Sequence, residues 1–168
     1  FAASIVLSKS DAQANPKYAS FVMEEVSGRI LFSRNADKQL YPASLAKIMT
    51  LYIVFEELQS KNLTLKSRVL ISKLAASRSP SKLYLKPGET ISVEEAILSL
   101  VTKSANDVAT AIAEKISISE RDFAKRMTRK AKALGMSRTI FKNASGLPNR
   151  SQKSTARDMA KLGIAIRR

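Results

Sequence analysis

Apolar residues near the N-terminus fall into two short runs on either side of a turn. The runs are Ser20–Val26 and Arg29–Phe32, and Ser27 and Gly28 separate them. Short runs rich in β-branched and aromatic residues around a glycine-containing turn are typical of a β-hairpin. We therefore predict a hairpin at the start of the folded part of the chain.

A longer apolar stretch follows Pro42 and runs from Leu45 to Leu58. On a helix, its apolar residues would cover nearly every side: Leu45, Ile48, Met49, Leu51, Tyr52, Val54 and Phe55. A helix that is apolar all round is normally buried at the centre of a domain. The pattern therefore predicts a central helix.

The middle of the chain predicts a short strand and then two helices. The strand is expected at Arg68–Ile71, and Pro87-Gly88 is typical of a turn. The sequence Ser92-Val93-Glu94-Glu95 matches a capping box, which opens a helix. Lys103–Asn106 interrupts the helical pattern, and a second helix is expected from Asp107 to about Ile116.

The last part predicts two further helices joined by a loop. Ser119 is placed to cap a third helix, which Gly135 ends. Asn143–Pro148 is expected to be a loop, and Thr155 to open an amphipathic helix. The chain of 168 residues, 45% of them hydrophobic, suits one compact domain. The predicted fold class is α+β, with an N-terminal hairpin followed by a helix-rich body.

Two absences from the composition limit the chemistry. The chain has no His and no Cys, which excludes a Ser-His-Asp triad, a thiol nucleophile and any metal site built on those ligands. A hydrolase of this composition must activate its nucleophile with Lys, a carboxylate, Tyr or water. We expect neither a metal nor a cofactor.

The net charge of +15 indicates attraction to an anionic partner. Positive charge is densest at Lys125–Lys132. The candidates are cell wall, lipid head groups and nucleic acid. Because no zinc-finger or RRM signature accompanies the charge, we expect an anionic cell-wall or membrane surface and no nucleic acid.

The first residues resemble the end of a secretory signal peptide. Phe1–Leu7 is small and apolar, and Ala12-Gln13-Ala14 fits the A-x-A cleavage pattern. We interpret residues 1–14 as a remnant of such a signal and expect a periplasmic protein; an ordinary disordered N-terminus is the alternative. No apolar run is long enough to span a membrane.

Ser44-Leu45-Ala46-Lys47 is an S-x-x-K motif at the start of the predicted central helix. Residues three apart lie on one face of a helix, so the Ser44 hydroxyl and the Lys47 amine can approach each other. Burial disfavours the ammonium form, which would lower the pKa of Lys47 towards that of a useful base. The Ser44 N–H, near a helix N-terminus, is available for an oxyanion hole.

The motif also has structural explanations and a chance copy. Ser44 could be a plain N-cap and Lys47 a surface side chain. Ser79-Pro80-Ser81-Lys82 matches the same pattern, but no long helix carries it. A second motif, Ser104-Ala105-Asn106, lies in the break between two predicted helices, where polar side chains can converge on a cleft; a pair of helix caps is the alternative.

Together these segments resemble a known family. Tyr41–Thr50 is similar to the active-site segment of the serine D-Ala-D-Ala carboxypeptidases, which are low-molecular-mass penicillin-binding proteins. Ser104–Asp107 resembles their second motif, and Phe141–Pro148 resembles a loop that they share. The resemblance covers about residues 15–168. It implies a β-lactamase/transpeptidase-like fold, in which a sheet packs against a helical subdomain.

The resemblance also implies roles for four residues. Ser44 would be acylated by the penultimate D-Ala of a peptidoglycan stem peptide, and water would hydrolyse the acyl-enzyme. Lys47 would be the base, Ser104 a proton relay and Asn106 a ligand of the substrate amide. β-Lactam antibiotics would also bind.

One family motif, Lys-Thr/Ser-Gly on a sheet strand, does not occur in this sequence. We therefore expect residues 15–168 to be a partial catalytic domain that lacks C-terminal strands and is inactive by itself. Membrane association would need a segment after Arg168. A class A β-lactamase is disfavoured because no Glu follows Glu120. The remaining alternative is an inactive relic that binds cell wall or nucleic acid through its positive charge.

Overall fold

The structure is a computed structural model that describes residues 18–167. The predicted signal remnant, residues 1–14, lies outside the described residues. The described chain has an α+β fold, as predicted. No helix in residues 18–167 is long and apolar enough to cross a membrane.

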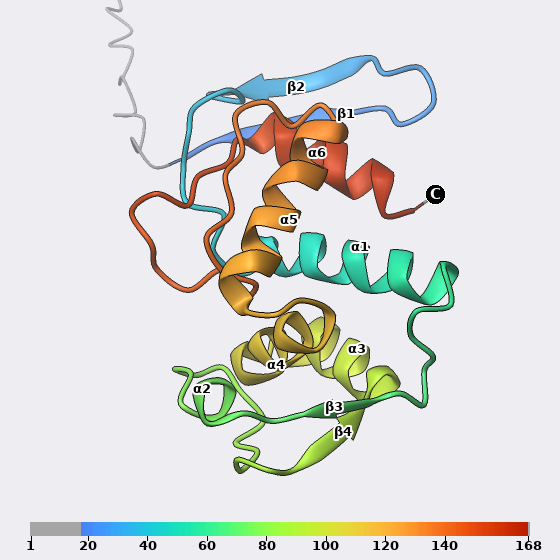
Figure 1. Ribbon diagram of the computed structural model, residues 1–168. Coiled ribbons are helices and arrows are strands. Elements are labelled where there is room, and N and C mark those ends of the chain that lie inside the picture. Colours follow the sequence, from blue (N-terminus) through green and yellow to red (C-terminus); the bar gives the residue numbers. More distant parts are fainter. Residues whose placement is uncertain (1–17, 168) are drawn as a thin grey trace, which may run out of the picture.

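The N-terminal hairpin is present, with strands β1 (Ser20–Met23) and β2 (Ile30–Arg34). The two strands pair antiparallel, with Ser20 opposite Arg34. Gly28 adopts φ +70° in the turn, a conformation that favours glycine. β1 packs on helix α6 (Ala156–Ala165), and the hairpin lies at the top of the molecule in Figure 1. All five residues of β2 are exposed.

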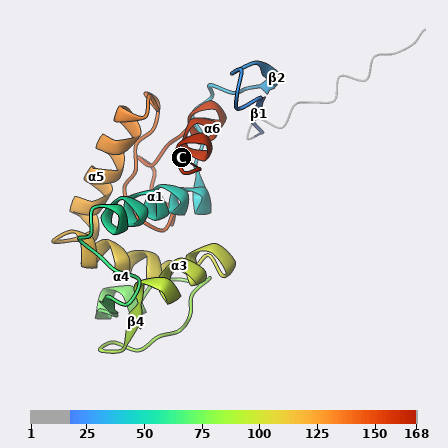
Figure 2. The same ribbon diagram turned by 90° about the vertical axis from the view of Figure 1, so that its right-hand side faces the viewer.

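The predicted central helix is α1 (Ala46–Gln59), preceded by a 3-10 turn, η1 (Ala43–Leu45). Figures 1 and 2 show α1 crossing the middle of the molecule, between α5 and α6 on one side and α3 and α4 on the other. Met49, Ile53 and Val54 are fully buried. Leu45 and Phe55, at 51% and 39% exposed, are exceptions to the all-round burial that the sequence predicted.

The other helices are α3 (Val93–Thr102), α4 (Asn106–Ile116) and α5 (Glu120–Ala133). The caps predicted for α3 and α5 are confirmed, whereas the N-cap of α4 is Ala105, which makes no side-chain cap hydrogen bond. Ser92 Oγ accepts a hydrogen bond from Glu95 N at 3.1 Å, and Ser92 N donates to Glu95 Oε2 at 2.7 Å, which completes the capping box. Ser119 and Thr155 cap α5 and α6 with their hydroxyl oxygens, which accept from Asp122 N and Asp158 N.

Strand β4 (Thr90–Ser92) and helix α2 (Lys73–Ala76) were not predicted, whereas the strand predicted at Arg68–Ile71 is present as β3 (Arg68–Leu70). β3 pairs antiparallel with β4, and α2, a single turn of helix, follows β3. β4 escaped prediction because it is only three residues long and its last residue is also the N-cap of α3.

Within residues 18–167, two isolated β-bridges lie outside the named strands. Leu40 pairs with Ser154, and Ile140 pairs with Lys153, as isolated antiparallel bridges. The first bridge places the loop before α6 beside the segment that leads into η1, and the second places it beside the chain that follows α5. Single-residue bridges have no periodic sequence pattern, so neither could be predicted.

Candidate active site

Ser44 lies in the 3-10 turn η1 and is exposed. The residue before it, Ala43, has φ +47°, in the left-handed region that is unfavourable for a residue with a side chain. Strained backbone of this kind persists only where the surroundings enforce it, and it is common at active sites. No hydrogen bond is recorded within residues 18–167 for the backbone N–H of Ser44, so this donor is free for a ligand.

Lys47 lies one turn further along, in the first turn of α1, and is only 3% exposed. Its Nζ donates a hydrogen bond to the backbone carbonyl of Ser145 at 2.6 Å. Burial lowers the pKa of Lys47 from 10.5 to about 8. Among the described residues no carboxylate pairs with this amine, so no negative charge opposes the effect of desolvation. The amine is therefore neutral in a useful fraction of molecules near neutral pH.

Gly146 enforces the geometry of the serine. It has φ +86°, and a Cβ placed on it would lie 1.8 Å from Ala43 O and 3.0 Å from Ser44 N. The loop from Asn143 to Leu147 therefore packs directly on the Ala43–Ser44 peptide, at a distance that only glycine permits.

The same loop is fixed to α1 by side chains from one helix face. Lys47 and Thr50 are three residues apart, and Thr50 Oγ1 donates to Ala144 O at 2.7 Å. Asn143 Oδ1 accepts from Gly146 N at 2.7 Å, which stabilises the turn itself. α1 thus carries the base and also holds the loop that contacts the serine.

Ser104 lies in the predicted break between α3 and α4 and is half-buried. Its φ of +54° makes it the second strained residue of the site. Ser81 Oγ donates to the neighbouring carbonyl of Lys103 at 2.8 Å, which holds the break from outside.

Asn106 begins α4 and is 6% exposed. Its Nδ2 donates to Ser79 O at 2.9 Å, and its backbone N donates to Ser81 O at 2.7 Å. The next residue, Asp107, is fully buried and accepts from Leu83 N at 3.0 Å. The start of α4 therefore anchors the segment that contains the second S-x-x-K copy, and that copy has no helix, as predicted.

Ser44, Lys47 and Ser104 line one cavity of about 540 Å³, which we call the Ser44 cavity. Its other lining residues are mostly apolar: Pro42, Ala43, Leu45, Ile48, Leu51, Leu100 and Val101. Asn106 does not line it. Ser44 Oγ and Lys47 Nζ form no hydrogen bond with each other in this structure, although both residues line the cavity; catalytic hydrogen bonds are often long without substrate. A nucleophile, a base and a second hydroxyl thus meet in a mainly apolar pocket.

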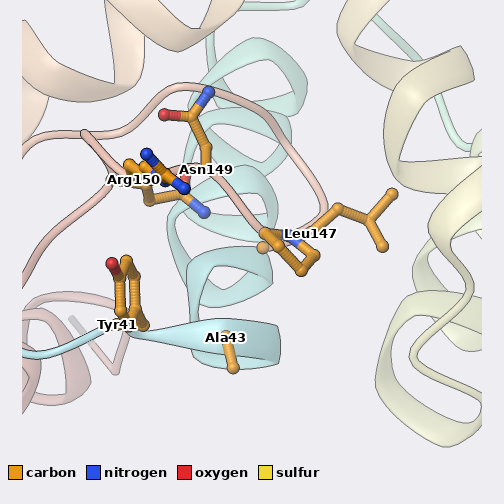
Figure 3. A pocket seen from close by; sticks show the side chains of 8 residues that line it. Tyr41, Ala43, Leu147, Asn149 and Arg150 are labelled. Carbon is orange, nitrogen blue, oxygen red and sulfur yellow. The ribbon is translucent and has the colours of Figure 1, made fainter.

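A second cavity of about 480 Å³ shares Ala43 with the first, and we call it the Tyr41 cavity. Figure 3 shows the side chains of Tyr41, Asn149 and Arg150 grouped together, while Leu147 points away from them. Lys153 Nζ lies 3.4 Å from the Tyr41 ring centroid and, by hydrogen bonding to the hydroxyl, lowers the pKa of Tyr41.

Several residues of this site carried no prediction. The loop Asn143–Pro148 was noted for its resemblance, but no role was assigned to the Ser145 carbonyl or to Gly146. The only available sequence signal for this contact was a glycine, Gly146, inside the predicted loop. No sequence signal pointed to the contact made by Thr50. Within residues 18–167, no group of three or more His, Cys, Asp or Glu side chains could hold a metal ion.

The sequence and the fold are both similar to those of known proteins. The sequence model of the D-alanyl-D-alanine carboxypeptidase family, peptidase family S11, matches residues 7–168. D-alanyl-D-alanine carboxypeptidase DacF of Bacillus subtilis is 38% identical over 147 residues, which are 88% of this chain and 38% of DacF. The chain therefore spans about two fifths of the length of this relative.

Solved structures agree in fold. The D-alanyl-D-alanine carboxypeptidase DacD from Francisella tularensis superposes with a TM-score of 0.86 at 36% identity, over 98% of this chain and 40% of that one. Penicillin-binding protein D2 from Listeria monocytogenes, in an ampicillin-bound form, superposes with a TM-score of 0.79 at 33% identity, over 88% of this chain and 60% of that one. The predicted transpeptidase-like fold is thus confirmed.

Proposed function

Since the chain belongs to the D-alanyl-D-alanine carboxypeptidase family, we propose that it forms the nucleophile-bearing part of a serine peptidase that removes the terminal D-Ala from peptidoglycan stem peptides. The observation that carries the proposal is the Ser44 cavity. There a buried lysine with a pKa of about 8 lies one turn from an exposed serine.

In the first step, Ser44 Oγ attacks the carbonyl carbon of the penultimate D-Ala, and the neutral amine of Lys47 takes the hydroxyl proton. A base whose pKa lies near the working pH serves this purpose best. The charge that develops on the carbonyl oxygen is stabilised by the free Ser44 N–H, and one such donor is worth about 10²–10³ in rate.

The tetrahedral intermediate then collapses. The C–N bond breaks, the terminal D-Ala leaves with a proton on its nitrogen, and Ser44 keeps the acyl group as an ester. Ser104, which lines the same cavity, would pass the proton to the leaving nitrogen. Water then hydrolyses the ester and restores the serine. Asn106 would bind the substrate amide, in which case its side chain has to give up or share its contact with Ser79.

β-Lactams would enter the same reaction. The ampicillin-bound structure of the Listeria relative supports the proposal that this chain also binds β-lactams, with Ser44 attacking the ring carbonyl. The ring amine cannot diffuse away as D-Ala does, so the acyl-enzyme would persist.

We further propose a periplasmic location and an anionic cell-wall or membrane surface as partner. Arg121, Lys125 and Arg129 follow one another every four residues on α5, and with Lys142 they line a groove of about 350 Å³. Of these, only Lys125 has a recorded ion pair within residues 18–167, with Asp122 at 2.8 Å. The groove therefore offers positive charge that is mostly uncompensated.

The test is release of D-Ala from a peptide that ends in D-Ala-D-Ala, by protein expressed from its complete reading frame. We expect release by the wild type, loss of release in Ser44→Ala and retention in Ser79→Ala, which changes the second motif copy. A wild type without release, or undiminished release by Ser44→Ala, would contradict the proposal.

A further inference from the structure

Glu120 is a buried carboxylate that the proposed reaction does not use. It is the first residue of α5, and its side chain is 7% exposed. It accepts hydrogen bonds from Arg78 Nη2, from Thr110 Oγ1 at 3.2 Å and from Ala144 N at 3.1 Å. A buried charge is tolerated only when paired and hydrogen-bonded, and here the partners come from three separate parts of the chain.

One of these partners leads to the base. Ala144 donates its N–H to Glu120 and accepts at its carbonyl from Thr50 Oγ1 at 2.7 Å. The next carbonyl, that of Ser145, accepts from Lys47 Nζ at 2.6 Å. Glu120 therefore fixes the loop from the side opposite α1, and the loop in turn orients the amine of Lys47.

A second partner, Arg78, leads to the second motif. Arg78 also donates from Nε to Thr110 Oγ1 at 3.0 Å, so its guanidinium is held at two points. The residues that follow it, Ser79 and Ser81, accept from Asn106 Nδ2 and N. Arg78 therefore anchors the segment that holds the start of α4, next to Ser104.

We propose that Glu120 is a positioning residue that couples the two halves of the active site, setting Lys47 and Ser44 against Ser104 and Asn106. The expected effect on catalysis rests on the proposed function. One series of hydrogen bonds connects Glu120 through the 143–147 loop to Lys47. Another connects Glu120 through Arg78 and the segment after it to Asn106. Misplacement of a catalytic group by about 1 Å can cost ~10² in rate, so loosening these contacts should slow the reaction.

A second ion pair provides a matched control. Glu57 of α1 pairs with Arg126 of α5, with side chains 12% and 30% exposed, against 7% and 26% for Glu120 and Arg78. Glu57 also accepts from Asn62 Nδ2 at 3.0 Å. It lies near the far end of α1 and lines no part of the Ser44 cavity. Breaking this pair tests the loss of an ion pair of similar burial without disturbing the loop.

The first experiment measures acylation by a labelled penicillin across pH, in protein expressed from its complete reading frame. We expect Glu120→Leu to acylate at least ~10-fold more slowly, and its rate to begin rising at a higher pH, because a displaced loop admits water to Lys47. Glu57→Leu should keep the wild-type rate and profile. Wild-type rate and profile in a folded Glu120→Leu would overturn the proposal. If that variant does not fold, Arg78→Met must show the slower acylation instead, and wild-type acylation by it would overturn the proposal equally.

The second experiment uses amide hydrogen exchange and needs no activity. Glu120→Gln or Glu120→Leu should lose protection in both residues 143–147 and residues 103–107, and Glu57→Leu in neither. Loss confined to one segment would contradict the coupling. If the wild type is not acylated at all, the proposed function fails, while the exchange data still decide whether Glu120 couples the two segments.

Discussion

At the scale of single residues, the chemistry depends on the burial of Lys47. The S-x-x-K spacing and the apolar residues around it predicted a desolvated lysine, and the structure places its side chain at 3% exposed. The sequence could not predict its partner, because the Ser145 carbonyl is 98 residues away in the chain. The roles assigned to Ser44, Lys47, Ser104 and Asn106 stay predictions.

The pH dependence of acylation follows from this burial. Only the neutral amine can take the serine proton, and the pKa of Lys47 is about 8. The rate of acylation by a labelled penicillin should therefore rise about tenfold per pH unit below that value and level off above it. Stopped-flow measurements across pH would show this, and a rate that is flat from acid to neutral pH would exclude Lys47 as the base.

The same burial should cost stability. A pKa lowered from 10.5 to about 8 corresponds to a penalty of about 3 kcal/mol for the ammonium form in the folded state at neutral pH. Lys47→Met removes that penalty but leaves the Ser145 carbonyl unpaired, at a cost of about 1–3 kcal/mol. We expect the free energy of unfolding at pH 7 to rise by about 1 kcal/mol, with loss of acylation.

Urea denaturation at several pH values tests how Lys47 changes the pH dependence of the free energy of unfolding. Between pH 8 and 10.5 the unfolded state binds the Lys47 proton more tightly than the folded state does, so the lysine makes wild-type stability rise with pH there. In Lys47→Met this rise should be smaller. An equal rise in both proteins would show that Lys47 is not desolvated.

At the scale of elements, the site depends on where helices begin and on one loop. Helix caps at Ser92, Ser119 and Thr155 could be predicted because their hydrogen bonds lie within four residues. The packing of the Asn143–Leu147 loop on η1 could not, because it depends on tertiary contacts between distant segments. β4 was missed because its last residue is also the N-cap of α3, and α2 because it is a single helical turn.

Gly146 provides the prediction at this scale. Gly146→Ala would place a Cβ 1.8 Å from Ala43 O, so the loop or the serine must move. We expect a loss of about 1–3 kcal/mol in stability and acylation slower by ~10² or more. Gly88→Ala is the matched control, because Gly88 has φ +91° but nothing within 4 Å of its added Cβ. Equal acylation by the two variants would show that the contact with Ala43 is unimportant.

At the scale of the whole molecule, α1 lies between two groups of helices (Figure 2), and the site forms where its first turn meets both. The hydrophobic pattern predicted this central helix and the α+β class. The resemblance of three motifs predicted the transpeptidase-like fold, which the solved structures confirm. The bridges from Leu40 to Ser154 and from Ile140 to Lys153 depend on the completed tertiary structure and escaped prediction.

The distribution of charge gives the prediction for the whole molecule. Replacing Arg121 and Arg129 in the α5 groove by Gln should weaken binding to vesicles of anionic phospholipid and reduce its dependence on salt. Lys61 and Lys66, both exposed, provide a control pair with the same change in net charge. Equal losses in the two double variants would show that binding follows net charge and not the groove.

The identity of Ser44 as the nucleophile can be tested by mapping a covalent adduct. Protein from the complete reading frame is treated with a labelled penicillin, digested and analysed by mass spectrometry. We expect one labelled peptide, with the acyl group on Ser44, and no label in Ser44→Ala. A label on Ser79, Ser81 or Ser104, or an unlabelled wild type, would contradict it.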